Sequence, residues 1–253
     1  LKTKGVAMRK LLTTAWIWFF GVVSLVVLFI PFFVLWIISW PFDQRHRCNM
    51  YYTSLWAMLY LKILPIKRVE VIGKHKLKPC MKAVAISNHQ SMADILVLFA
   101  VFPYYIWVSK KENFQAPILG WVMYLNGYIS LDRNDPKTFP KMYKKISEKL
   151  AKNFTIMMFP EGTRSKNCEI GRFKDGAFRA AIENKASIVP IVLDGTGNAI
   201  PKEGIAVNKG DRIIVKVLDE VPYDKFPTYN PAELKEYFRD MIAKELAALR
   251  SEN

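Results

Sequence analysis

The feature that most constrains this chain is a stretch of 32 residues, 11–42, without a single charged side chain. As one helix it would be about 48 Å long, whereas the hydrocarbon core of a bilayer is about 30 Å thick. The stretch therefore predicts a membrane anchor, with Pro31 as the place for a kink or a break. The rest of the chain has the composition of an ordinary water-soluble domain.

Basic residues on both sides of this stretch bear on its orientation. They are Lys2, Lys4, Arg9 and Lys10 before it and Arg45 and Arg47 after it. The first group also resembles the start of a cleaved signal peptide, but the apolar run is too long for one and lacks an A-x-A cleavage site. Because positive flanks stay in the cytoplasm, both ends of an uncleaved anchor are expected there.

A second nearly uncharged segment, 49–64, is rich in aromatic residues and suits a helix lying in the membrane interface. We therefore predict a two-helix anchoring unit over residues 1–67, embedded in the cell membrane from its cytoplasmic face. On this interpretation the unit does not cross the bilayer completely. The length of the first segment leaves a single crossing open as the alternative.

The formal net charge of +15 fits either nucleic acid or an anionic membrane surface as a partner. The apolar segment beside the charge favours the phospholipid bilayer, and no nucleic-acid partner is expected. The three cysteines are odd in number and widely spaced, and the three histidines are scattered without an HExxH motif. A disulfide framework, a metal site and a resident cofactor are therefore not expected.

From residue 68 the pattern changes to short apolar runs that alternate with helical stretches. The predicted strands are Arg68–Ile72, Ala83–Ser87, Tyr104–Ser109, Tyr128–Leu131, Thr155–Phe159, Ile188–Leu193 and Arg212–Leu218. The predicted helices are Ala93–Val101, Pro117–Asn126, Phe139–Lys152, Gly176–Asn184 and Pro231–Arg250, with Asn230 as the N-cap of the last. This alternation predicts an α/β domain over residues 68–253, with a mostly parallel central sheet flanked by helices.

The sequence NHQSMAD, residues 88–94, comes directly after a predicted strand and leads into a predicted helix. Catalytic groups in open α/β sheets lie at this end of the strands. Asp94 can fold back onto the imidazole of His89 and fix its tautomer, as the acid does for the base in a serine triad. No G-x-S-x-G motif supplies a serine nucleophile. The base could instead deprotonate a hydroxyl of the substrate; a buried histidine with a structural role is the alternative.

The sequence FPEGTRS, residues 159–165, also follows a predicted strand. Gly162 permits a tight turn, and the guanidinium of Arg164 matches the oxygens of a phosphate group. A third strand end carries Lys110, which could complete an anion site. Each motif taken alone could equally be a solvated surface turn.

Taken together and in this order, the two motifs, the stretch from Lys110 to Arg133 and the run Val189–Ile191 resemble the glycerolipid acyltransferase family with the HxxxxD motif. The closest resemblance is to its 1-acyl-glycerol-3-phosphate acyltransferase branch, and it covers about residues 68–220. Asn113 departs from the leucine of many members, with little expected consequence. The resemblance also supports the two-helix anchoring unit.

The resemblance implies an enzyme that transfers a fatty acyl group from a thioester to the 2-hydroxyl of lysophosphatidic acid and produces phosphatidic acid. Acyl-carrier protein and coenzyme A both remain open as the acyl carrier. The resemblance implies His89 as general base and Asp94 as its orienting partner. The residues implied in binding the substrate are Lys110, Glu161, Gly162, Thr163, Arg164 and Ser165.

Three alternatives remain open at this stage. The acceptor could be another lysophospholipid or glycerol 3-phosphate. A lipid hydrolase would need no acceptor, but the missing serine motif argues against it. A non-catalytic basic protein that binds membranes or nucleic acid would explain the charge of +15 but not the ordered motifs.

Overall fold

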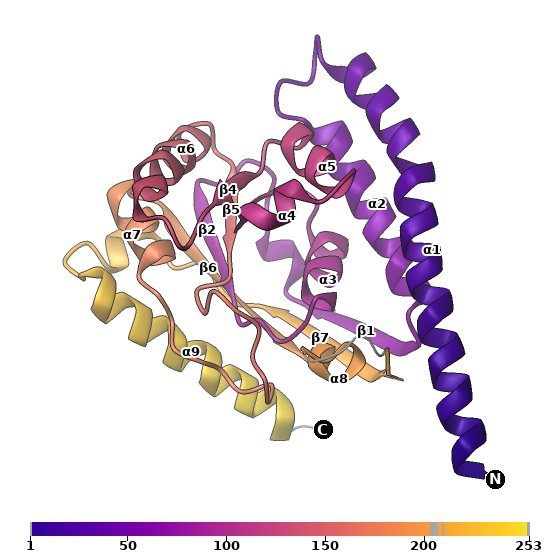
Figure 1. The fold of residues 1–253 in the computed structure, drawn as a ribbon. Coiled ribbons are helices and arrows are strands. Elements are labelled where there is room, and N and C mark those ends of the chain that lie inside the picture. Colours follow the sequence, from indigo (N-terminus) through magenta and orange to yellow (C-terminus); the bar gives the residue numbers. More distant parts are fainter. Residues whose placement is uncertain (1, 203–206, 209, 252–253) are drawn as a thin grey trace.

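The computed structural model describes residues 2–202, 207–208 and 210–251. It is an α/β structure in which seven strands form one sheet between layers of helices (Figure 1). The strands are β1 (Ile66–Ile72), β2 (Ala83–Ser87), β3 (Tyr105–Lys110), β4 (Ile129–Leu131), β5 (Thr155–Met158), β6 (Ser187–Asp194) and β7 (Gly210–Val217). The predicted fold class is confirmed.

The order of strands across the sheet is β1-β7-β6-β2-β5-β3-β4. All neighbours pair in parallel except β6 and β7, which are antiparallel. The five residues of β2, at the centre, are all buried. Parallel strands covered on both faces need such continuous apolar runs, and this is why the sequence predicted all seven strands to within two residues at either end.

Helices cover both faces of the sheet, with α6, α7 and α9 on one side and α3 with the N-terminal helices on the other (Figure 1). Their bounds are α3 (Ala93–Val101), α4 (Lys111–Gln115), α5 (Leu119–Leu125), α6 (Phe139–Ala151), α7 (Gly176–Glu183), α8 (Thr196–Ala199) and α9 (Pro231–Ser251). Short 3-10 turns occupy Lys74–Lys76, Pro136–Thr138 and Tyr223–Lys225. The predicted cap of α9 is confirmed, because the Oδ1 atom of Asn230 accepts hydrogen bonds from the backbone N–H groups of Ala232 and Glu233.

Two helices, α1 (Lys2–Ser39) and α2 (Arg47–Ile63), form an antiparallel hairpin at the N-terminal side. Side-chain hydrogen bonds join them at successive levels, from Ser24 to Tyr60 at 2.9 Å and from Asn49 to the carbonyl of Phe32 at 3.0 Å. Of the kink or break predicted at Pro31, the break is wrong, because α1 continues through this residue. The adjacent Phe32 is fully buried, and this packing stabilises the turn that the proline weakens.

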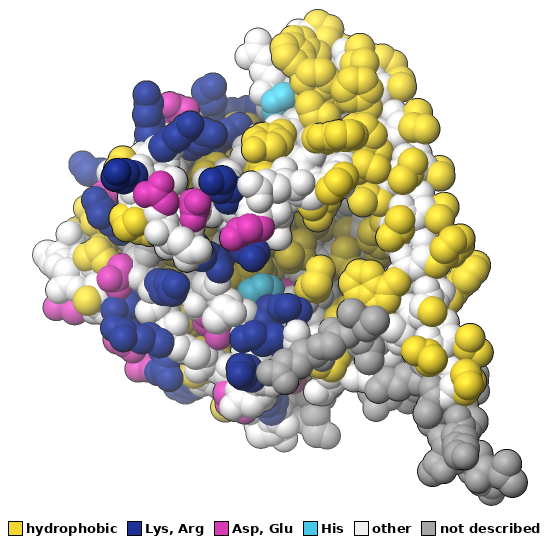
Figure 2. Space-filling model, viewed as in Figure 1, with side chains coloured by type: hydrophobic (Ala, Val, Ile, Leu, Met, Phe, Trp, Pro, Cys, Tyr) yellow, Lys and Arg dark blue, Asp and Glu magenta, His cyan; other side chains and the backbone are white. Residues whose placement is uncertain are grey.

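Helix α1 lies alongside the α/β body rather than extending away from it. Near its start, Thr14 is buried and its hydroxyl accepts a hydrogen bond from the backbone N–H of Val207. Towards its other end, Phe32 packs with Val122 of α5. The outward face of α1 is covered with hydrophobic side chains (Figure 2). Within the described residues, Leu11–Ser39 is the one helical segment long and apolar enough to cross a membrane.

Candidate active site

Three neighbouring parallel strands, β2, β5 and β3, bring the sequence motifs to one edge of the sheet. Residues 88–94 follow β2, residues 159–165 follow β5, and Lys110 is the last residue of β3. The carboxyl ends of parallel strands share one edge, so segments that are about 70 residues apart in sequence become neighbours here. The chain continues from β2 towards β3 in one direction across the sheet and from β5 towards β6 in the other, so the two motif loops lie where the strand order reverses.

His89 and Asp94 are in direct contact at this edge. The Nδ1 atom of His89 lies 2.7 Å from the Oδ2 atom of Asp94, whose side chain is fully buried. The same oxygen accepts the backbone N–H groups of Gln90 at 2.7 Å and Ser91 at 2.9 Å. Because that oxygen accepts two backbone bonds, the proton shared with the imidazole belongs to Nδ1. In the neutral imidazole this arrangement would leave the lone pair on Nε2, as a base requires.

The imidazole of His89 is held on its flat side by Phe159. The two rings are stacked, with their centroids 3.9 Å apart and an angle of 9° between their planes. The His89 side chain nevertheless keeps 14% of its surface exposed. Asp94 and Phe159 therefore fix the orientation of a ring that can still reach a bound molecule.

Glu161 joins the two motif loops through backbone hydrogen bonds. Its Oε1 atom accepts the N–H of His89 at 2.8 Å, and its Oε2 atom accepts the N–H of Gly171 at 3.0 Å. Burial raises the pKa of this carboxyl above its ordinary value, although the two N–H groups oppose the rise. A second bond between the two motif loops runs from the N–H of Ser165 to the carbonyl of His89 at 2.7 Å. The loop that follows β5 is thus attached to the backbone of His89 on both sides of the turn.

The turn at Gly162 gathers positive charge. Gly162 has a φ of +70°, the left-handed conformation that glycine adopts without strain, and its N–H donates to the carbonyl of Phe159. The guanidinium of Arg133 donates to the carbonyl of Gly162, and the side chain of Lys174 lies beside its Cα atom. The amine of Lys202 donates to the carbonyl of Arg164. Cations from three separate segments of the chain therefore lie at the turn that follows β5, as an anionic substrate would require.

The sequence matches one protein family and several of its known members. The model of the family described as Acyltransferase matches residues 68–194, which contain both motif loops and half of the chain. A 1-acyl-sn-glycerol-3-phosphate acyltransferase of Haemophilus influenzae is 31% identical over 182 residues, and the match covers 69% of this chain and 72% of that protein.

This chain belongs to the acyltransferase family.

A further relative and one solved structure each match most of this acyltransferase chain. A 1-acyl-sn-glycerol-3-phosphate acyltransferase of Chlamydomonas reinhardtii is 32% identical over 226 residues, with 87% of this chain and 66% of that protein covered. The crystal structure of the 1-acyl-sn-glycerophosphate acyltransferase PlsC from Thermotoga maritima has the same fold, with a TM-score of 0.80 over 96% of this chain and 97% of that one. Its sequence identity is 22%. The chain spans between about half and two thirds of the length of the algal and plant relatives it matches.

The structure brings some of the predicted site residues of the acyltransferase into mutual contact and leaves others apart. His89, Asp94, Glu161, Gly162 and Ser165 belong to one hydrogen-bonded loop pair. Thr163 is exposed, and Arg164 is half-buried with its carbonyl held by Lys202. Lys110 lies at the same sheet edge, but its amine is 3.8 Å from Glu112 rather than next to His89.

Two cations of this site, Lys174 and Lys202, were missed by the sequence analysis. Both lie in irregular segments between elements, and nothing in the spacing of those segments indicates that they return to the turn at Gly162. The residues that the structure describes contain no group of three side chains that could hold a metal ion. This arrangement of the acyltransferase offers an oriented imidazole, that of His89, and a cationic turn.

Proposed function

We propose that this acyltransferase moves a fatty acyl group from an acyl thioester to the 2-hydroxyl of 1-acyl-glycerol-3-phosphate, giving phosphatidic acid for phospholipid biosynthesis. The observation that carries the proposal is the His89–Asp94 pair beside a cationic turn, with Nε2 of His89 bound by no residue that the structure describes. The relatives support the acceptor, because they are named 1-acyl-sn-glycerol-3-phosphate acyltransferases. The donor is the thioester of acyl-carrier protein or of coenzyme A, and the reaction needs neither a metal nor a resident cofactor.

In the proposed mechanism, Nε2 of His89 removes the proton of the 2-hydroxyl as its oxygen attacks the thioester carbonyl. A new C–O bond forms, the tetrahedral intermediate collapses, and the C–S bond breaks. The imidazolium then returns the proton to the departing thiolate, so His89 ends in its starting state. Asp94 stabilises the imidazolium between the two steps. A base of this kind contributes about 10²–10⁴-fold to the rate.

The cationic turn would hold the phosphate of the acceptor. We assign this role to Arg164 and Lys110, with Gly162, Thr163 and Ser165 shaping the turn around it. Glu161 keeps that turn attached to the backbone of His89. Fixing the phosphate places the 2-hydroxyl near the base, and orientation of this kind lowers the barrier by several kcal/mol.

We further propose that residues 1–67 anchor the catalytic domain, 68–253, to the cytoplasmic face of the cell membrane. The contacts of α1 with the body favour a helix that lies in the interface. Thr14 and Phe32 both touch the α/β body, and they are about 27 Å apart along the helix. A helix crossing the bilayer would carry those contacts, and the body with them, into the hydrocarbon.

The proposal is tested by acyl transfer in detergent micelles, with labelled acyl thioesters of both carrier types and lysophosphatidic acid as acceptor. Wild type should form phosphatidic acid, and His89→Ala should reduce the rate by about 10²–10⁴-fold because the base is lost. Asp94→Asn should reduce kcat as well, since the imidazole then loses its orienting charge. Both variants should still bind lysophosphatidic acid, which separates loss of chemistry from loss of the site.

Parallel acceptors decide between the alternatives. Lysophosphatidylcholine or glycerol 3-phosphate as the preferred acceptor would replace the proposed substrate and keep the proposed base. Release of free fatty acid without an acceptor would indicate a hydrolase. If the wild-type protein acylates none of these acceptors from either donor, the assignment of His89 as a base fails.

A further inference from the structure

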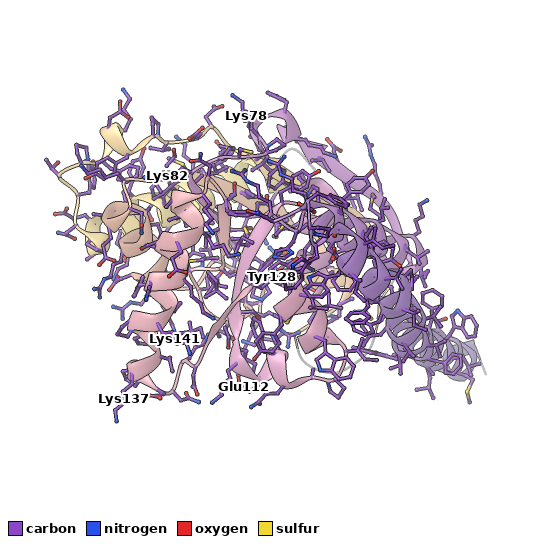
Figure 3. The ribbon with its side chains drawn as sticks, turned by 90° about the horizontal axis from the view of Figure 1, so that it is seen from above. Lys78, Lys82, Glu112, Tyr128, Lys137 and Lys141 are labelled. Carbon is purple, nitrogen blue, oxygen red and sulfur yellow. The ribbon has the colours of Figure 1, made fainter. Side chains whose placement is uncertain are left out.

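A second cationic pocket lies at the opposite edge of the sheet from His89. Cys80 precedes β2 and Phe154 precedes β5, so both mark the amino ends of strands whose carboxyl ends carry the motif loops. The five residues of β2 alone separate the two edges by about 16 Å. The lining of the pocket includes Arg45, Arg47, Met50, Cys80, Tyr104 and Phe154. Figure 3 shows Lys78 and Lys82, which flank Cys80 in sequence, on the side of the molecule away from Glu112.

Two guanidinium groups converge in this pocket. Arg45 donates from Nη1 to the sulfur of Cys80 at 2.9 Å, and Arg47 donates to the same sulfur from Nη2. A thiol sulfur is a weak acceptor, whereas each guanidinium has five N–H donors. Among the described residues Cys80 is the one side-chain acceptor that the two guanidinium groups meet, so most of their N–H donors remain available to a ligand.

Aromatic rings hold both arginines in this position. The guanidinium carbon of Arg45 lies 5.6 Å from the ring centre of Phe154, and that of Arg47 lies 5.8 Å from the ring centre of Tyr104. The amine of Lys149 adds a third cation 5.2 Å from the same Phe154 ring. Guanidinium groups held against aromatic rings lose little conformational freedom when they bind an anion. The pocket is therefore preorganised for anion binding.

Positive charge in this pocket lacks an internal counter-charge. Within the described ranges of the chain, neither Arg45 nor Arg47 lies within ion-pair distance of a carboxylate. Two like charges that converge on one thiol repel each other, and a group with two or more anionic oxygens would relieve that repulsion. Phosphate matches the planar fork of arginine with paired hydrogen bonds.

The position of the pocket indicates where such a phosphate would come from. Arg45 follows the last residue of α1, Ser39, by six positions, and the residues between include the exposed Trp40 and Phe42. If α1 lies in the membrane interface, the pocket is at the level of the lipid headgroups. We propose that Arg45 and Arg47 bind the phosphate of an anionic membrane lipid, at a site separate from the catalytic one.

This inference rests on the membrane placement within the proposed function, but not on the proposed reaction. Cys80 provides a native reporter, since a phosphate between the two arginines covers its sulfur. A Cys48→Ser, Cys168→Ser background leaves Cys80 as the remaining thiol of the three. The measurement is its rate of reaction with N-ethylmaleimide in nonionic micelles, with phosphatidylglycerol, phosphatidylcholine or inorganic phosphate added at equal concentration.

Phosphatidylglycerol at about ten times its Kd should slow the reaction by about tenfold, because only the free pocket reacts. Phosphatidylcholine and inorganic phosphate should change it by less than about twofold. Arg45→Gln with Arg47→Gln should abolish the protection, each variant being compared with itself without lipid. The matched control, Lys78→Gln with Lys82→Gln, removes two nearby charges outside the pocket and should keep the protection.

The inference is overturned if phosphatidylcholine protects equally or if protection survives in the arginine variant. Loss of protection in the lysine control would show general attraction to a basic surface instead of a pocket. Equal protection by inorganic phosphate would show an ion site and not a lipid site. Acyl transfer should be unchanged in the arginine variant. The labelling experiment does not depend on turnover, so an inactive wild-type protein would count against the proposed reaction but not against the lipid site.

Discussion

At the scale of single residues, the site depends on how one carboxylate oxygen is shared. The Oδ2 atom of Asp94 accepts from the imidazole of His89 and from two backbone N–H groups, while its Oδ1 atom is buried without a hydrogen-bond partner among the described residues. The Asp94 carboxylate therefore both holds the backbone of residues 90 and 91 in place and orients the His89 ring. A change at Asp94 should consequently affect stability as well as kcat.

Glu161 gives a prediction on pH. Burial raises the pKa of its carboxyl above the ordinary 4.5, so the folded protein keeps this proton to a higher pH than the unfolded chain does. Ionising Glu161 then destabilises the fold, and its contribution to the free energy of unfolding falls as the pH rises from 4.5 through the raised value. The melting temperature of wild type minus that of Glu161→Gln, measured in micelles, should decrease across this range.

Asp132→Asn provides the control of opposite sign. The backbone N–H of Asn134 and then the amine of Lys111 lower the pKa of Asp132, so its stabilising contribution is lost as the pH falls. The melting temperature of wild type minus that of Asp132→Asn should increase with pH. Equal slopes for the two variants would contradict the buried position of Glu161.

Residue types and spacing were enough to predict the contact of His89 with Asp94, since five positions at the start of a helix bring the carboxylate back to the ring. They were not enough for the stacking of His89 on Phe159, which depends on the register of β2 against β5. The cations Lys174 and Lys202 reach the site through irregular segments, whose path follows from tertiary packing and not from any local pattern. The catalytic and binding roles of the predicted residues remain predictions.

At the scale of secondary-structure elements, the C-terminal helix α9 stabilises the loop that follows the turn at Gly162. Arg250, in its last turn, forms ion pairs with Asp194 at 3.2 Å and Glu169 at 3.0 Å. It also donates to the carbonyl of Cys168 at 2.7 Å. One side chain thus joins α9, the end of β6 and the loop whose Gly171 binds Glu161.

Removing the Arg250 contacts should make the loop beside the site more mobile without changing any of the predicted site residues. We expect Arg250→Gln to lower kcat/KM by about tenfold, equivalent to about 1.4 kcal/mol, because the loop between residues 165 and 172 loses its two contacts with Arg250 and its link to β6. Amide hydrogen exchange at Gly171 should become faster in the same variant, and Arg250→Lys should recover only part of both effects.

Arg179→Gln is the matched control for Arg250. Arg179 pairs with Glu183 one turn along the exposed face of α7, where solvent screens the interaction. Its loss should leave kcat/KM and the exchange of Gly171 unchanged. Equal effects of the two arginine changes would exclude a specific role for the Arg250 contacts.

The regular elements were predictable because their apolar periodicity is strong, whereas the short ones were not. Helices α4 and α8 have five and four residues, too few for a helical period to show in the sequence. The antiparallel pairing of β7 with β6 also escaped prediction, since direction depends on the long connection between them. The unbroken helix at Pro31 depends on packing of Phe32 against α2 and α5.

At the scale of the whole molecule, one flank is apolar and the other is charged. The hydrophobic side chains of α1 form one side of the space-filling view, and Lys and Arg side chains gather over the α/β body (Figure 2). Val26 and Ile30 are among the exposed residues of α1, with 50% and 63% of their surfaces accessible. Such a surface binds lipid through burial of apolar area.

Charges on that surface should therefore release the protein from membranes. We expect Val26→Lys with Ile30→Lys to reduce the vesicle-bound fraction in a flotation assay, since burying this face in lipid would remove water from two unpaired ammonium groups. Ala232→Lys with Ala247→Lys adds the same charge to exposed positions of α9 and should leave binding unchanged. Undiminished flotation of the first variant would show that α1 does not contact the hydrocarbon.

The strand order also has a consequence for biosynthesis. β1 follows the N-terminal hairpin directly, but its neighbour β7 begins only at Gly210. At about 5–20 residues per second, a ribosome needs roughly 7–30 s to make the chain between them. During that interval β1 has not yet paired with β7, whereas the neighbouring helix pair α1–α2 is already synthesised and can bind lipid through its apolar face. The nascent chain is thus expected to reach the membrane before its sheet is complete, and the last step of folding joins the earliest strand to the latest.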